Sequence, residues 1–377
     1  MTLRPFPSRL AAIAPTALLL ASCAQDGPPP EPPLPTEALE AVVVEPGISR
    51  ETLARALDEV FEADGVGETR AVIVMREGEI VAERYAEGFD AETRHMGWSL
   101  SKAVTAALVG MVVADGRIGL DDPAPVPAWQ RAGDPRSEIT LRQLLQMRSG
   151  LRHTENSQPI YDSPEVQMMY GRGRGDMAAW AEAQPLAFDP GTQFAYSTPT
   201  TVILADIATD LIAEGSSPDE RQQAMAEFVD ARLAVPLGMA SLVGECDVSG
   251  TLLGGSHFYA TARDWARFGE FLRRGGVADG VQVVPRGWID FMRQPSPASP
   301  DYGAQIWLNR DSGEEREVLF PGQGPESAFA MVGRGGQYVI VSPEDRLTVV
   351  RLGNSTEEQL PTVMAELADI FALYSGK

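Results

Sequence analysis

Strand-like segments lie near both ends of the chain, and this arrangement constrains the fold more than any other feature of the sequence. Residues 71–88 (AVIVMREGEIVAERYAEG) predict two strands that turn at residues 76–78. Residues 330–343 and 346–353 predict two more strands, joined at residues 343–345. Helical patterns dominate the chain between them, above all from about 126 to 245. Since strands must pair to satisfy their backbone groups, we expect one sheet built from both chain ends and an inserted, mostly helical lobe.

We therefore predict an α/β (α+β) fold in which helices flank an antiparallel sheet. Helix start signals support this organisation. Ser49, Thr140 and Thr261 each precede an apolar-periodic run, and serine and threonine favour the N-cap because their side chains accept backbone N–H groups. A final helix is predicted from about Thr356 to Tyr374.

A single internal lysine stands at the start of an Ala/Val-rich run that reads WSLSKAVTAALVG. The chain holds 31 Lys+Arg residues, and only Lys102 and the last residue are lysine. Ser99 lies three positions earlier, so a helix beginning at Ser99 would place the hydroxyl and the amine on one face. Arginine stays charged in proteins, whereas a desolvated lysine can lose its proton near neutral pH. The S-x-x-K spacing therefore predicts a serine with an amine that can act as its base.

Five segments together resemble one family. They occur in the family's order and are WSLSKAVTAALVG, ITLRQLLQMRSGL, PGTQFAYST, YATARDWARFG and GRGGQYVIVSP. The chain resembles the serine β-lactamase-like superfamily in its class C and family VIII esterase branch, and within it the 6-aminohexanoate-dimer (nylon-oligomer) hydrolase-like serine hydrolases. The resemblance covers residues 50 to about 375 and implies a β-lactamase/transpeptidase-like fold.

The resemblance implies a role for each member of a catalytic trio. Ser99 would be the nucleophile that forms an acyl-enzyme, with Lys102 beside it. Tyr196 would move protons between the nucleophile and the leaving group. The backbone N–H groups of Ser99 and Arg334 would form the oxyanion hole, which stabilises charge that develops on the tetrahedral intermediate.

Four further residues are candidates for substrate binding. By resemblance, Trp307 matches a substrate-contacting tryptophan, although an ordinary core role is an equal alternative. The glycines at 333 and 335 would let a strand backbone approach the substrate closely. Tyr170 is a candidate for the wall of the cleft on the side of the helical lobe.

Two departures from the penicillin-recognising pattern bear on the substrate. Residues 331–333 read Met-Val-Gly where those relatives have Lys-Thr-Gly, so a substrate carboxylate would lack its usual partner. Residues 196–198 read Tyr-Ser-Thr where many relatives have Tyr-x-Asn. We therefore expect a serine hydrolase of small carboxylic esters or linear amides. A β-lactamase or D-alanyl-D-alanine peptidase is the alternative.

Other functional classes fit the sequence less well. The segment GWSLS at 97–101 breaks the G-x-S-x-G pattern of α/β-hydrolases at its last position. Only His95, His153 and His257 are histidines, and they lack zinc-ligand spacing, so no metal and no other cofactor is expected. The non-enzyme alternative is a lipoprotein that binds peptidoglycan or a protein partner, although such modules usually lose one member of the trio. The net charge of −22 argues against nucleic acid as a partner.

The N-terminus predicts export and anchoring. Residues 1–22 read as a lipoprotein signal peptide with a basic start and an apolar stretch, and Leu-Ala-Ser-Cys ending at Cys23 resembles a lipobox. An ordinary secretory signal is the alternative. Cys23 would be lipidated, residues 23–47 would form a Pro/Glu-rich tether, and residues 48–377 would form the hydrolase domain. Ala24 is not the inner-membrane retention aspartate, so we expect a bacterial envelope lipoprotein of the outer membrane that faces the periplasm and meets small-molecule substrates there.

Overall fold

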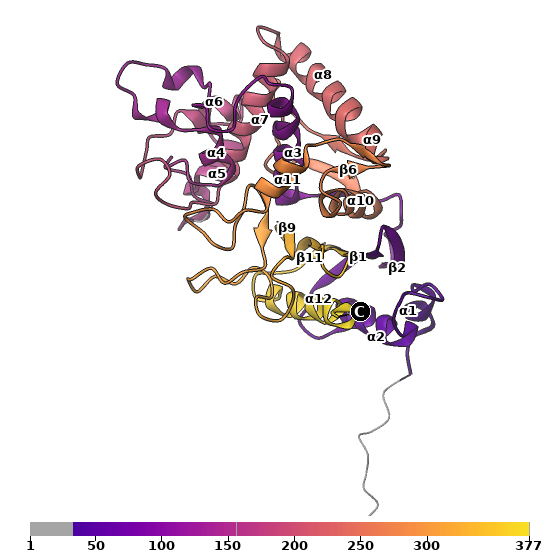
Figure 1. Cartoon of the computed structure of the whole chain (residues 1–377). Helices are drawn as coiled ribbons and strands as arrows, with labels where there is room; N and C mark the ends of the chain where they lie inside the picture. Colours follow the sequence, from indigo (N-terminus) through magenta and orange to yellow (C-terminus); the bar gives the residue numbers. More distant parts are fainter. Residues whose placement is uncertain (1–32, 156, 377) are drawn as a thin grey trace, which may run out of the picture. The chain divides into compact units, whose positions relative to one another are not determined.

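A six-stranded antiparallel sheet organises the chain in the computed structural model, which describes residues 33–155 and 157–376 (Figure 1). The strand order is β2-β1-β11-β10-β9-β8, and each neighbouring pair is antiparallel. The strands are β1 (Glu68–Arg76), β2 (Glu79–Tyr85), β8 (Trp307–Leu308), β9 (Phe329–Gly333), β10 (Gln337–Ser342) and β11 (Leu347–Asn354). The prediction that both chain ends build one sheet is confirmed.

One predicted strand is wrong in its extent. The segment 330–343 divides into β9 and β10 at a tight turn over residues 334–336. Gly335 and Gly336 have φ angles of +74° and +78°, values that glycine adopts without a steric penalty. The turn reverses the chain within three residues.

The alternation of side chains along the strands produces two apolar layers. Val72 and Val74 belong to the layer that includes α2 (Arg50–Glu62) and α12 (Leu360–Tyr374). Ile73, on the opposite face, belongs to the layer that includes α10 (Ala262–Arg273). Figure 1 shows α2 and α12 on one side of the sheet and α10 on the other. The sheet is therefore covered on both faces, as the fold-class prediction requires.

The predicted caps are present. The side chain of Ser49 accepts the N–H of Thr52, and that of Thr261 accepts the N–H of Asp264, each at 3.3 Å. Thr140 forms a reciprocal capping box at the start of α4 (Leu141–Leu145). The last helix begins at Leu360 rather than Thr356, with Pro361 in its first turn, where a missing N–H costs nothing.

The inserted lobe is mostly helical, as predicted. The 15-residue helix α7 (Thr198–Ile212) is the centre of this lobe. It packs against α4 and against α3 (Ser101–Ala114), α6 (Met177–Glu182) and α8 (Pro218–Val229). The lobe also contains α5 (Pro164–Met169), a π-helical turn (Asp230–Ala234) and α9 (Val235–Leu237). Smaller elements follow: the sheet β3-β5-β4 (Arg94–Met96, Phe258–Thr261, Val243–Gly244), the hairpin β6-β7 (Val277–Ala278, Val281–Gln282) and α11 (Arg286–Met292).

The predicted tether is wrong from about residue 36 onward. Residues 36–40 form the short helix α1 (Thr36–Glu40), and Val42 makes a β-bridge with Ala82. Ala38 and Val42 are buried because their apolar side chains pack into the layer that includes α2 and α12. The folded unit therefore begins near Leu34 instead of Ile48.

The predicted signal peptide, Cys23 and the first part of the tether lie outside the described residues. Among residues 33–155 and 157–376, no helix is long and apolar enough to cross a membrane.

Candidate active site

Ser99 lies in a strained turn between β3 and α3. The 3₁₀ turn Trp98–Leu100 leads directly into α3, so the regular helix starts at Ser101, two residues later than expected. Trp98 has φ +48°, a left-handed conformation that costs an aromatic residue of order 1–3 kcal/mol. Two hydrogen bonds to β5 hold the segment: the Gly97 N–H donates to the Phe258 carbonyl at 2.8 Å, and the Phe258 N–H donates to Ser101 Oγ at 3.1 Å. The serine is thus presented on a turn that the surrounding structure enforces.

Lys102 lies beside this serine and is 1% exposed. Its Nζ donates to Ser99 Oγ at 2.8 Å, to Thr198 Oγ1 at 2.8 Å and to the Gly255 carbonyl at 3.1 Å. Burial lowers the pKa of Lys102, because the charged form loses its hydration, and nearby Glu155 and Glu165 raise it in smaller measure. The arrangement combines an amine of lowered pKa with a hydroxyl in hydrogen-bonding contact.

Tyr196 comes from the loop that enters α7, where Ser197 is the N-cap. Lys102 Nζ is 4.8 Å from the centre of the Tyr196 ring. Burial and the carboxyl group of Glu155 raise the pKa of Tyr196 well above its usual value, and a hydrogen bond with the Ser99 side chain opposes this. Because its pKa is raised, Tyr196 carries its proton at neutral pH. The structure thus brings together Ser99, Lys102 and Tyr196, the three residues chosen from the sequence.

The turn between β9 and β10 lies directly against the nucleophile segment. A Cβ built on Gly333 would be 2.5 Å from the Gly97 carbonyl oxygen, so only glycine allows β9 to come this close. Arg334 follows at the start of the turn. Gln337 Nε2 donates to the Arg334 carbonyl at 2.9 Å, and the fully buried Arg351 donates to the Gly336 carbonyl at 2.9 Å. These bonds fix the backbone that carries the Arg334 N–H.

An aromatic cluster lies beside Tyr196. The Trp307 ring centre is 5.3 Å from that of Tyr196 and 4.8 Å from that of Tyr302. Trp307 is 8% exposed, so it is a buried neighbour of the catalytic tyrosine candidate. The hydroxyl of Tyr302 is buried and has no hydrogen-bond partner among the described residues. Tyr170, the fourth substrate-binding candidate, ends α5 and is 64% exposed.

Three residues of the site were not predicted from the sequence as functional groups: Gly255, Glu155 and Glu165. Glu155 Oε1 accepts the Thr198 N–H and the Thr198 hydroxyl, each at 2.5 Å, and lies 3.8 Å from Lys102 Nζ. Burial, and then the nearby Glu155, raise the pKa of Glu165 on α5. The sequence marked Thr198 only as a departure from the asparagine two residues after Tyr196, and its contacts with Lys102 and Glu155 come from the structure. Glu155 lies in an irregular loop, where no periodicity marks its direction.

Two of the histidines, His95 and His153, are buried outside the trio. His153 is buried between Thr200 Oγ1 and the Ala181 carbonyl, each 3.0 Å from a ring nitrogen, and burial lowers its pKa to about 4. Burial also lowers the pKa of His95 to about 4. Within the described part of the chain, no group of three or more His, Cys, Asp or Glu side chains is placed to hold a metal ion. Cys246 is a free, half-buried thiol whose pKa burial raises to about 11.

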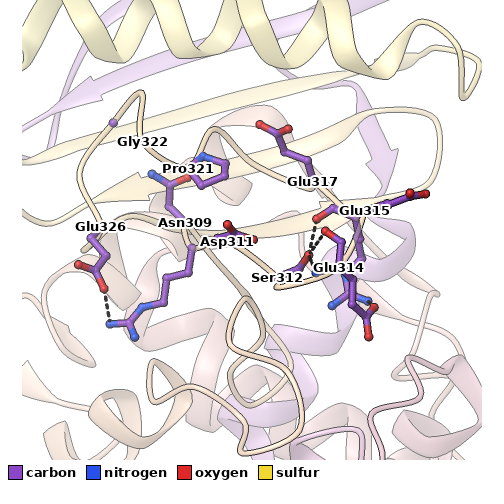
Figure 2. A pocket seen from close by; sticks show the side chains of 12 residues that line it. Asn309, Asp311, Ser312, Glu314, Glu315, Glu317, Pro321, Gly322 and Glu326 are labelled. Carbon is purple, nitrogen blue, oxygen red and sulfur yellow. Dashed lines mark hydrogen bonds and ion pairs between the residues drawn. The ribbon is translucent and has the colours of Figure 1, made fainter.

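One surface hollow is lined by none of the trio. Its volume is about 840 Å³, and it lies between residues 309–317 and 321–326 (Figure 2). Figure 2 shows several carboxyl groups around it, and Arg310 pairs with Glu326 at 3.1 Å. A second hollow of about 340 Å³ is lined by Trp98, Arg334 and Gly335, among others, and therefore adjoins the nucleophile segment and the β9–β10 turn.

The beta-lactamase family model matches residues 55–372. The 6-aminohexanoate-dimer hydrolase of Paenarthrobacter ureafaciens is 29% identical over an alignment of 269 residues. The alignment covers 68% of this chain and 66%, just under two thirds, of that protein.

Solved structures share the fold. A family VIII carboxylesterase superposes with a TM-score of 0.62 at 17% identity, covering 85% of this chain and 96% of that one. A beta-lactamase from Mycobacterium bovis superposes with a TM-score of 0.60 at 18% identity, covering 85% and 99%. At these identities the likeness concerns the fold alone.

Proposed function

The chain belongs to the beta-lactamase family, and from this premise we propose that it is a serine hydrolase that cleaves small carboxylic esters or linear amides through an acyl-enzyme on Ser99. One observation carries the proposal: Ser99 Oγ accepts a 2.8 Å hydrogen bond from Lys102, an amine that is 1% exposed. A buried amine of lowered pKa beside a hydroxyl is the arrangement that activates a serine nucleophile.

Acylation follows from the positions of the trio. Ser99 Oγ attacks the substrate carbonyl carbon while its proton passes to the Lys102 amine. The carbonyl π electrons move to the oxygen, where the N–H groups of Ser99 and Arg334 stabilise the negative charge. The carbonyl then re-forms as the bond to the leaving group breaks. Tyr196 gives its phenolic proton to the leaving alcohol or amine and regains a proton from the Lys102 ammonium.

Deacylation reverses these transfers with water in place of the leaving group. Water attacks the acyl carbon, its proton passes through Tyr196 to Lys102, and the tetrahedral intermediate collapses to the carboxylic acid. Ser99 takes back the proton from Lys102 and leaves as the free hydroxyl. A neutral Tyr196 suits this work, because a phenol both gives and accepts a proton during the cycle.

The residues near the trio favour esters and linear amides over β-lactams. Met331 stands on β9 where penicillin-recognising relatives have lysine, so that position offers no cation for a substrate carboxylate. The hydroxyl of Thr198 is engaged by Lys102 and Glu155 instead of presenting a free amide to the substrate. The similarity to a 6-aminohexanoate-dimer hydrolase supports the linear-amide part of the proposal.

The test compares wild type with Ser99→Ala in the protein from residue 24 onward. Substrates are p-nitrophenyl acetate, p-nitrophenyl butyrate and nitrocefin. We expect ester turnover that Ser99→Ala abolishes and a much weaker cleavage of nitrocefin. Ser375→Ala, an exposed serine near the C-terminus, is the control and should keep wild-type turnover. Faster cleavage of nitrocefin than of the esters would assign the protein to the β-lactamases, and turnover that survives Ser99→Ala would refute the nucleophile.

The membrane anchor is a further part of the proposal. We propose that Cys23 is lipidated and that the hydrolase is held at the bacterial outer membrane, facing the periplasm. The support is the Leu-Ala-Ser-Cys sequence that follows the apolar stretch of the N-terminus. Metabolic labelling with a palmitate analogue tests this: the label should appear in wild type and be lost in Cys23→Ser. Equal labelling of both proteins would refute lipidation at this residue.

A further inference from the structure

The surroundings of Lys102 constrain the direction in which this amine can accept a proton. Its Nζ contacts three oxygen atoms, on Ser99, Thr198 and Gly255, at 2.8, 2.8 and 3.1 Å. A protonated lysine has three N–H donors, one for each oxygen, whereas a neutral amine has two N–H donors and one free electron pair. To act as the base for Ser99, Lys102 must be neutral with its electron pair towards Ser99 Oγ. The other two oxygens must then receive its two N–H groups.

The two oxygens differ in their hydrogen-bonding roles: a carbonyl oxygen can only accept a hydrogen bond, whereas a hydroxyl can accept or donate one. The Gly255 carbonyl oxygen only accepts hydrogen bonds, so it always takes an N–H from Lys102. The Thr198 hydroxyl can accept from Lys102, but it can also turn its own proton towards the electron pair of the amine. In the second case Thr198 would occupy the electron pair that Ser99 needs.

Glu155 removes this second possibility. Its Oε1 lies 2.5 Å from Thr198 Oγ1 and 2.5 Å from the Thr198 backbone nitrogen, so two donors converge on one carboxylate oxygen. An ionised carboxylate only accepts, so the single hydroxyl proton of Thr198 points to Glu155. We propose that Glu155 is a positioning residue which, by holding the Thr198 proton, turns the free electron pair of Lys102 towards Ser99. The inference rests on the proposed hydrolase function.

The negative charge of Glu155 and its orienting effect on Lys102 have opposite consequences for the acylation rate. An experiment can therefore distinguish them. The carboxylate is 3.8 Å from Lys102 Nζ and favours the protonated amine. Glu165 on α5 acts in the same direction, Tyr196 also faces the amine, and Arg334 lies close enough to Glu165 to interact with it. If only charge mattered, removal of Glu155 would give more neutral Lys102 and faster acylation. If orientation matters, removal slows acylation despite the larger neutral fraction.

The experiment measures the pre-steady-state burst of p-nitrophenol from p-nitrophenyl butyrate. Glu155→Ala should lower the acylation rate constant by about 10- to 100-fold with little change in the substrate dissociation constant. Glu155→Gln keeps an amide oxygen that accepts the Thr198 proton, so it should stay within about threefold of wild type. Thr198→Val, which removes the bridging hydroxyl, should be slow, and the matched control Thr198→Ser should keep most of the rate.

A double-mutant cycle provides the decisive result, because the two residues act through one hydrogen bond. In the Thr198→Val background, Glu155→Ala should cause no further loss of rate. If the rate reductions of Glu155→Ala and Thr198→Val multiply in the double variant, the inference is overturned. It is also overturned if Glu155→Ala acylates at a rate equal to or above that of wild type. A Thr198→Val rate equal to that of Thr198→Ser would also overturn it, even if Glu155→Ala does not fold. No release of p-nitrophenol by wild type, or equal release by Ser99→Ala, would instead refute the hydrolase function.

Discussion

Replacement of Gly333 by alanine should separate the oxyanion hole from the nucleophile. The added Cβ would lie 2.5 Å from the Gly97 carbonyl oxygen, whereas ordinary contact begins at 3.4 Å, so β9 and the nucleophile segment must move apart by 3.4 − 2.5 = 0.9 Å. The atom in the way belongs to the backbone, and no side-chain rotation relieves the clash. An oxyanion hole needs both donors within hydrogen-bonding distance of one oxygen. A misplacement of about 1 Å costs on the order of 10²-fold in rate.

The assay for Gly333→Ala is steady-state hydrolysis of p-nitrophenyl butyrate, together with a thermal unfolding midpoint. We expect kcat to fall about 100-fold while KM changes little, because the donors act on charge that develops only in the transition state. The control is Gly287→Ala on α11, where the new Cβ meets nothing within 4 Å and activity should be unchanged. A folded Gly333→Ala variant with kcat within twofold of wild type would show that the β9 backbone does not supply the oxyanion hole.

Three other substitutions test the chemistry and the electrostatics of the fold. Lys102→Arg should reduce kcat about as much as Ser99→Ala, because arginine keeps its proton, and a wild-type rate at any pH would remove Lys102 as the base. Tyr196→Phe should lower kcat by about 10²-fold or more in steady-state assays with an unchanged melting temperature, and an unaltered kcat would exclude the phenol from proton transfer. Burial, and then the carboxyl groups of Asp206 and Asp210, raise the pKa of Glu182 to about 8, so the folded protein keeps a proton that the unfolded chain loses near pH 4.5. Wild type therefore loses stability as pH rises from about 4.5 to 8, and Glu182→Gln should gain over it by at most about 1.4 kcal/mol per pH unit in that window. Urea midpoints measured at pH 5 and pH 8 check this, and an equal difference at both values would contradict it.

Much of the architecture could be predicted because it follows from local patterns. The apolar run at residues 71–75 lies in a segment that predicted a strand, and its Ile73 and Val74 enter opposite layers. Ser49 and Thr261 cap the helices that they were expected to cap, since an N-cap involves only the next three residues. The prediction of a tether failed at residues 36–42. This stretch is too short to show a periodic apolar pattern, yet its apolar side chains pack against the folded domain.

The sequence by itself determined that Ser99 and Lys102 face each other, because residues three apart on a helical turn are neighbours whatever the rest of the chain does. Only the tertiary structure decided what surrounds them. Thr198 lies 96 positions from Lys102 and Gly255 lies 153, and both contacts depend on how α7 and the segment before β5 pack against α3. Glu155 is brought to Thr198 by a loop without a repeating pattern. Contacts of this kind arise from the summed packing of many buried side chains, which no short stretch of sequence contains.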